Sequence, residues 1–148
     1  MEWPGLDLVS PQALPAQIAE TINEATKRQV YSLFSGQQAE RRFIPFVAVH
    51  EFEALLFSDA RTLAAQLEID ESTVTSVISE SGSPEAINNS PQTAPSKRLD
   101  SWSANGKFLK TTMGIKIAQA IGIEKIRKKC HLFDGWLTRF EEIQRGVQ

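Results

Sequence analysis

Apolar positions are densest over residues 43–49, which read Phe-Ile-Pro-Phe-Val-Ala-Val. The run does not alternate with polar residues, which is typical of a β-strand covered on both faces. Pro45 lies inside the run and removes one ladder donor, so the strand is expected near the edge of its sheet. The pattern therefore predicts one strong strand at about 43–49.

Most of the remaining chain repeats apolar residues three to five positions apart, which predicts about six to eight helices. Asp59 and Asp70 are expected N-caps, and Pro15, Pro84 and Pro95 suit the first turn of a helix. The predicted helices cover residues 14–34, 50–57, 60–67, 71–79, 97–104, 115–121, 123–129 and 133–143, and a single further turn is expected from residue 84.

One strand cannot form a sheet, and the chain offers only weak further candidates at Gly5–Val9 and Gln29–Phe34. The sheet is therefore expected to be small, to be completed by another chain, or to belong to a larger α/β domain. Strand exchange in a homodimer would also complete it. The predicted fold is a helix-rich α/β domain that spans residues 1–148 as one unit.

Length and composition fit this expectation, because 148 residues with 41% hydrophobic and 23% charged residues are ordinary for one soluble domain. No apolar run approaches the roughly 18 residues that cross a bilayer, so no membrane association is expected. The first residues do not resemble a signal peptide, which makes a cytoplasmic location the default. Cys130 stands alone and is expected to be a small buried residue.

Charge is unevenly distributed along the chain. Residues 1–96 hold 5 Lys or Arg against 13 Asp or Glu, whereas residues 97–129 hold 9 against 2. The basic stretch could face an anionic partner such as nucleic acid. Its alternative role is a solvated surface that balances the acidic half, and the sequence leaves both open.

Three ionisable residues, His50, Glu51 and Glu53, follow the apolar run directly. Ligands in open α/β sheets bind past the carboxyl ends of strands, and Mg²⁺ takes carboxylate oxygens. Glu51 and Glu53 are therefore candidate magnesium ligands, and His50, Glu51 and Glu53 are candidate catalytic residues, with His50 relaying a proton. Alternatively, His50 is a buried, hydrogen-bonded histidine and the two glutamates are first-turn helix charges.

Ser96, Lys97 and Arg98 form a second candidate group, at the helix start that Pro95 predicts. Backbone N–H groups at a helix N-terminus and adjacent cations can bind phosphate, so these residues are candidates for binding phosphate or nucleic acid. The alternative is capping by Thr93 or Ser96 together with a solvated Lys-Arg pair.

Seven short segments, in order along nearly the whole chain, resemble an uncharacterised bacterial family, domain of unknown function 4276. They are Trp-Pro-Gly at 3–5, His-Glu-Phe-Glu-Ala-Leu-Leu-Phe-Ser-Asp at 50–59, Pro-Glu-Ala-Ile-Asn at 84–88, Pro-Gln-Thr-Ala-Pro-Ser-Lys-Arg-Leu at 91–99, Gly-Ile-Lys-Ile-Ala-Gln-Ala-Ile-Gly at 114–122, Ile-Arg-Lys-Lys-Cys at 126–130 and Phe-Asp-Gly-Trp-Leu at 133–137.

The resemblance is to the C-terminal half of this family and implies a partial TOPRIM-like domain, with Mg²⁺ as cofactor and metal-dependent nuclease activity at the family level. The acidic strand-loop motifs expected earlier in the family are absent from residues 1–148, so this chain is expected to be inactive alone. Its partners would be nucleic acid, a missing N-terminal half or a second copy. The alternative is a non-catalytic interaction module that self-associates or pairs with a partner through a sheet edge.

Overall fold

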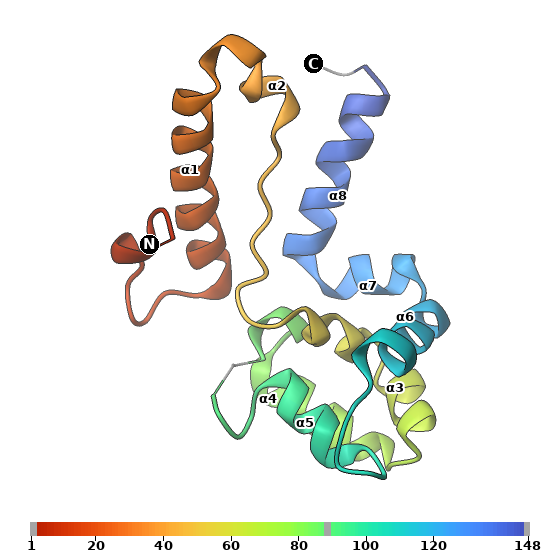
Figure 1. Ribbon diagram of the computed structural model, residues 1–148. Coiled ribbons are helices and arrows are strands. Elements are labelled where there is room, and N and C mark those ends of the chain that lie inside the picture. Colours follow the sequence, from red (N-terminus) through yellow and green to blue (C-terminus); the bar gives the residue numbers. More distant parts are fainter. Residues whose placement is uncertain (1–2, 88–89, 147–148) are drawn as a thin grey trace. The chain divides into compact units, whose positions relative to one another are not determined.

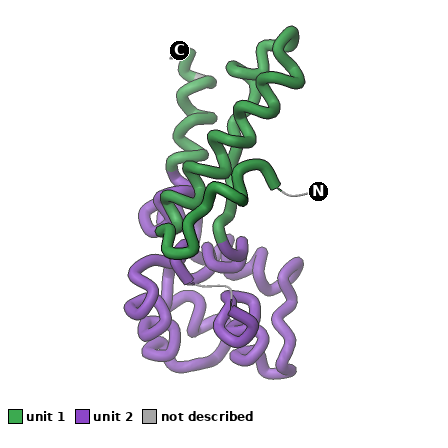
Figure 2. Tube along the Cα trace, turned by 90° about the vertical axis from the view of Figure 1, so that its left-hand side faces the viewer, with its two compact units in different colours: residues 1–49, 135–148 green, residues 50–134 purple. Residues whose placement is uncertain are grey.

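A computed structural model describes residues 3–87 and 90–146, and these residues divide into two compact units (Figures 1 and 2). Unit 1 comprises residues 1–49 and 135–148, and unit 2 comprises residues 50–134. The sequence predicts one domain over 1–148, whereas the packing of the chain is organised in these two parts.

Unit 1 is built around α1 (Pro15–Leu33), which begins with the first-turn proline that the sequence predicts. Gly5 adopts φ 78° before α1, and a Cβ atom there would lie 2.6 Å from the Ala25 Cβ of α1, so a glycine is required for this close approach. The other elements of unit 1 are η1 (Leu6–Leu8), η2 (Ser35–Gln37), α2 (Ala39–Arg42) and the part of α8 (His131–Gln144) that begins at Gly135.

The predicted α/β fold with a strong strand at about 43–49 is wrong, because residues 3–87 and 90–146 contain no β-strand. Residues 43–48 are extended, yet they pair with no second strand and belong to no sheet. They lie beside α8 instead, where the Phe46 ring stacks on the Trp136 ring with centroids 4.9 Å apart (Figure 1). An apolar, non-alternating run shows that a segment is covered but does not identify what covers it.

The two weak strand candidates are also helical. Residues 6–8 of the first form η1, and residues 29–33 of the second complete α1. The helix-rich part of the prediction is confirmed, because α1 to α8 account for most of the described chain. Asn88, the last residue of the Pro84–Asn88 segment, lies outside the described residues.

Unit 2 consists of short helices joined by tight turns. Asp59 and Asp70 accept hydrogen bonds from the backbone N–H groups of Thr62 and Ser72, as expected of N-cap residues. Its elements are η3 (Phe52–Ser58), α3 (Ala60–Leu67), α4 (Glu71–Ser81), η4 (Pro84–Ala86), α5 (Pro95–Trp102), the π-helical turn η5 (Lys110–Gly114), α6 (Ile115–Ile121), α7 (Ile123–Lys129) and the first turn of α8.

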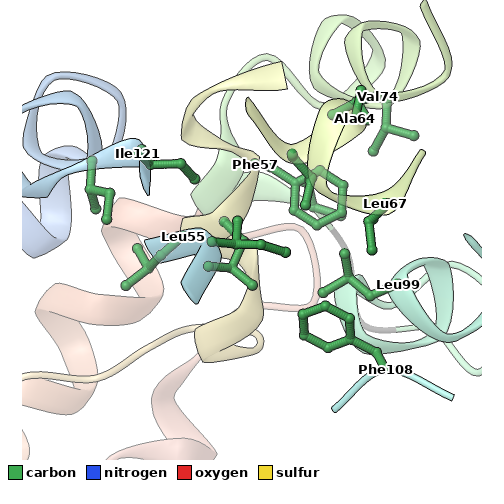
Figure 3. Close-up of a cluster of buried hydrophobic side chains, with 14 of the residues drawn as sticks. Leu55, Phe57, Ala64, Leu67, Val74, Leu99, Phe108 and Ile121 are labelled. Atoms are coloured by element: carbon green, nitrogen blue, oxygen red, sulfur yellow. The ribbon is translucent and has the colours of Figure 1, made fainter. Parts of the chain in front are cut away.

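The buried apolar cluster of unit 2 gathers side chains from η3, α3, α4, α5, α6 and α7 (Figure 3). Phe57 of η3, Leu63 of α3 and Leu99 of α5 have no exposed surface. Burying residues of this size contributes roughly 1.5–3 kcal/mol each to folding. η3 therefore forms the centre of unit 2, and it fixes the positions of the ionisable residues that precede it and begin it.

Candidate functional site

The ionisable residues predicted to form a catalytic site occupy the entry to η3. Glu51 is the extended residue before η3, and Glu53 lies in its first turn. Both glutamates are half-buried, and each contacts a different element of unit 2. The two carboxylates therefore have different partners and do not form one group.

Glu51 caps α5. Its carboxylate accepts a hydrogen bond from the Ser96 N–H at 2.6 Å and a second from the Ser96 hydroxyl at 2.8 Å. Ala94, the N-cap of α5, has no side-chain acceptor, and Pro95 has no N–H, so the first N–H of this helix that needs an acceptor is that of Ser96. A carboxylate also interacts favourably with the positive end of the helix dipole. Both carboxylate oxygens of Glu51 thus bind Ser96, which lies 45 residues further along the chain.

Glu53 forms an ion pair with Lys110, the first residue of η5. The Glu53 side chain is 13% exposed and the Lys110 side chain is 59% exposed. The hydrogen bond that the Lys110 ammonium donates to Glu53 raises the pKa of the lysine. Glu53 therefore joins η3 to η5.

His50 precedes Glu51 and has a different environment from either glutamate. Burial lowers the pKa of its imidazole, and Nδ1 is buried without a hydrogen-bond partner among the described residues. The neutral form of the ring is therefore favoured, and His50 is not the hydrogen-bonded histidine of the alternative interpretation. Its proposed role as a proton relay remains a prediction.

The predicted phosphate-binding group is only partly available for a ligand. Ser96 is buried and donates both its N–H and its hydroxyl hydrogen to Glu51. The Arg98 Nε donates to the Thr93 carbonyl oxygen at 2.8 Å, whereas Lys97 is exposed. The structure therefore brings together Glu51 and Ser96, which the sequence assigned to separate sites, and joins them to each other.

The arrangement of Glu51 and Glu53 does not fit a magnesium ion. A Mg²⁺ site needs oxygen atoms that converge with free lone pairs, but the Glu51 oxygens face two donors and Glu53 faces an ammonium group. The part of the chain that the structure describes contains no group of three or more His, Cys, Asp or Glu residues that could hold a metal. The Mg²⁺ expectation therefore has no support from this geometry.

Glu85 is a second long-range cap, to which sequence reasoning assigned no role. Its two carboxylate oxygens accept hydrogen bonds from the N–H groups of Leu132 and Phe133, both at 2.9 Å, in the first turn of α8. Glu85 lies in the Pro84–Asn88 segment, which is one of the segments that resemble the family, so the sequence marked its neighbourhood but not its role. The partner lies 47 residues further along the chain and cannot be deduced from spacing.

Basic residues of the segment 97–129 are partly neutralised within unit 2. Lys125 pairs with Asp59, Lys110 with Glu53, and Arg127 with Asp134. The first two of these acids belong to the acidic half of the sequence, so part of the charge imbalance is offset within unit 2. The two roles that the sequence left open for the basic stretch, a solvated surface and a surface for an anionic partner, stay predictions.

Unit 1 has an extended segment whose main chain has few partners. The Ile44 carbonyl oxygen accepts a hydrogen bond from the Trp136 Nε1 at 3.4 Å. Within the described ranges, the backbone groups of Val47, Ala48 and Val49 form no hydrogen bond with any other segment. Val47 and Val49 are half-buried and Ala48 is exposed.

Unit 1 also buries little apolar surface. Among its described residues, the buried apolar side chains are Ala19, Ile22 and Ala39. By contrast, Leu14 and Leu33 of α1 are 66% and 69% exposed. The other large apolar residues exposed in unit 1 are Trp3, Leu6, Leu8, Phe34, Phe140 and Ile143. Such exposure is typical of a surface that another polypeptide covers.

Comparisons with known proteins give one match. The family model described as "Domain of unknown function (DUF4276)" matches residues 6–141. No curated protein and no solved structure is significantly similar to the chain. Among the described residues, no helix has both the length and the apolar character needed to span a membrane.

Proposed function

The chain belongs to this family of unknown function, DUF4276, and we propose that it is a protein-association module that binds a partner polypeptide alongside residues 43–49. In this mode, an extended segment of the partner lies beside residues 43–49 and exchanges main-chain hydrogen bonds with them. The observation that carries the proposal is the unpaired backbone of Val47 and Ala48 in an apolar, extended segment that ends in a bend at Val49.

The chemistry of the segment supports this mode of binding. Residues 43–49 carry no charge and include Ile44, Val47 and Val49, whose β-branched side chains favour extended backbone. Main-chain hydrogen bonds supply affinity in strand addition with little dependence on the partner's sequence. The sparse core of unit 1 gives the association a second driving force, because a partner would bury its exposed apolar side chains.

The contacts in the structure give less support to the metal-dependent nuclease that the resemblance implies. Glu51 and Glu53, its proposed metal ligands, already bind Ser96 and Lys110. These contacts account for the presence of both glutamates at the entry to η3, so no catalytic role is needed to explain their position. We therefore favour the association module.

A generic strand peptide tests this proposal. The probe is a dye-labelled ten-residue peptide of alternating Thr and Val with a lysine at each end, titrated with the intact protein and followed by fluorescence anisotropy. Its control has the same composition with D-Thr at every Thr position, which prevents the regular pleat of an L-strand. Because each lost main-chain hydrogen bond costs about 1 kcal/mol, we expect the control to bind at least roughly tenfold more weakly.

The same titration with the Val47→Pro/Ala48→Pro double variant locates the binding. Two adjacent prolines remove one donor from each edge of the extended segment, so peptide binding should be lost whichever edge is used. Equal binding of the L-peptide and the D-Thr control, or unchanged binding by the double variant, would refute strand addition at residues 43–49.

A further inference from the structure

We propose that α8 contains a hinge at Gly135, at which residues 136–144 change direction relative to residues 131–134. This motion goes beyond the proposed function, because it needs no bound partner. Three features of the described chain support it. α8 is anchored on both sides of Gly135, the glycine itself has no packing role, and the main chain at residues 49–50 is weakly restrained.

The chain passes between the two units at two places. α8 is one continuous helix, yet its first turn belongs to unit 2 and the part that begins at Gly135 belongs to unit 1. The other passage lies between Val49 and His50. Any change in the direction of one unit must therefore be accommodated at these two places.

Before Gly135, α8 is anchored to other elements of unit 2. The Glu85 carboxylate accepts hydrogen bonds from the N–H groups of residues 132 and 133. Asp134 forms an ion pair with Arg127 of α7. These contacts fix the direction of the first turn of α8 within unit 2.

After Gly135, α8 is anchored to unit 1. The Trp136 Nε1 donates to the Ile44 carbonyl oxygen, and the indole stacks on the Phe46 ring. Phe140, one turn further along α8, packs edge-on against the same indole with ring centroids 5.0 Å apart. Gly135 is therefore the residue between two parts of one helix that different units hold.

Neither packing nor backbone geometry requires a glycine at position 135. A Cβ atom there would meet no atom within 4 Å beyond the adjoining backbone of its own helix, and Gly135 is not among the glycines with positive φ. Alanine would fit this position and would favour the helix more strongly. The glycine thus weakens α8 between its two anchored parts, which is where a hinge residue is expected.

The second passage between the units can also change direction. Val49 and His50 form a bend. Their main-chain groups form no hydrogen bond with any residue in the described ranges 3–87 and 90–146. Such a bend can absorb changes in φ and ψ without breaking main-chain hydrogen bonds. It therefore does not oppose a hinge in α8.

Pulsed electron paramagnetic resonance on the full chain measures this motion. One spin label at Arg139→Cys, after Gly135 in α8, is paired with a second at Thr75→Cys in α4 of unit 2, and both positions are exposed. The reference pair, Thr75→Cys with Lys128→Cys, lies wholly within unit 2. The native thiol of Cys130 is buried, and mass spectrometry checks that it takes up no label. We expect the distance distribution of the first pair to be at least about twice as broad as that of the reference pair.

Gly135→Ala tests the hinge residue, and Gly36→Ala is its matched control. Alanine at position 135 favours the continuous helix roughly fivefold, so the population of bent molecules should fall roughly fivefold and the distribution should narrow. Gly36, in η2 of unit 1, also has no atom within 4 Å of an added Cβ and no positive φ. Its alanine variant should leave the distribution unchanged. Circular dichroism checks that both variants keep their helices.

Three outcomes would each overturn the hinge. They are a first-pair distribution as narrow as that of the reference pair, an unchanged distribution in Gly135→Ala, and equal narrowing in Gly36→Ala. None of them changes the peptide titration that tests strand addition at residues 43–49. The hinge and the proposed function can therefore fail independently.

Discussion

A carboxylate at the first turn of a helix stabilises it most when two donors meet its two oxygens. Glu51 does this for α5, and its contacts with Ser96 replace the side-chain cap that Ala94 cannot provide. Hydrogen bonds to a charged group contribute about 1.5–3 kcal/mol, more than ordinary ones. At the residue scale, Glu51 is therefore a positioning residue for α5.

We expect Glu51→Gln to lower the free energy of unfolding by about 1.5–3 kcal/mol, because the amide carries no charge and offers one acceptor oxygen where the carboxylate offers two. Urea denaturation followed by the fluorescence of Trp102, which contacts Phe57 in the core of unit 2, measures the change. Glu80→Gln, at an exposed position of α4, is the matched control and should have little effect.

A double-mutant cycle that combines Glu51→Gln with Ser96→Ala measures the interaction energy between these two residues. The two substitutions should be non-additive by about 1–2 kcal/mol, because either one removes contacts that the other also needs. Strict additivity would show that Glu51 and Ser96 do not interact in solution.

Burial should make Cys130 unreactive. It raises the pKa of the thiol from 9.0 to about 11, and the Ser58 hydroxyl lies 3.2 Å from the sulfur. The thiolate is the reactive form, so modification by a disulfide reagent at pH 8 should be about 100-fold slower than in the protein unfolded in urea. Because the unfolded state releases this proton first, stability should also fall as the pH rises from about 9 to about 11. Equal rates in native and unfolded protein would contradict this prediction.

The sequence could identify single residues by their local chemistry but not by their distant contacts. It predicted Asp59 and Asp70 as N-caps, because the residues that an N-cap binds are two or three positions away. It also marked Glu51 as unusual, since a charged residue follows an apolar run. It could not indicate that the partner is Ser96, because spacing along the chain carries no information on contacts 45 residues apart.

Helices were predictable at the scale of elements because their hydrogen bonds are local. The predicted helices at 60–67, 115–121 and 123–129 coincide with α3, α6 and α7, and the helix predicted at 14–34 differs from α1 by one residue at each end. The strand at 43–49 failed because a strand exists only through a neighbour. Its extended conformation was predictable, whereas its lack of a paired strand was not.

The start of α8 should depend on Glu85. The N–H groups of Leu132 and Phe133 lose both acceptors in Glu85→Ala, so the first turn of α8 should fray. We expect the free energy of unfolding to fall by about 2 kcal/mol and amide hydrogen exchange at residues 132–134 to quicken.

Glu71→Ala is the control for this change, because Glu71 is exposed in the first turn of α4, where Asp70 already supplies the cap. If exchange at residues 132–134 stays slow in Glu85→Ala, another group must satisfy these amides.

At the scale of the whole molecule, unit 2 has its own apolar core and unit 1 does not. Every member of the buried cluster, from Leu55 to Cys130, lies within residues 50–134. Both long-range caps join elements of unit 2 as well. The division into two units could not be predicted, because no change in composition and no linker marks residue 49.

We therefore expect the fragment 50–134 to fold by itself, with the helix content of unit 2 and a cooperative thermal transition within about 10 °C of the full chain. The fragment 1–49 lacks α8 and buries little apolar surface, so it should be largely unfolded. Circular dichroism of the two fragments measures this. A disordered 50–134 fragment would show that unit 2 needs unit 1.

Trp136 has a consequence for the size of any assembly that this chain forms. A segment with two accessible edges can recruit neighbours on both sides without limit, which leads to fibres. The Trp136 indole donates to the Ile44 carbonyl oxygen and so removes one acceptor from the edge of the segment that faces α8. In the proposed association, that edge therefore offers fewer main-chain groups to a second partner, which disfavours the addition of chains on both sides.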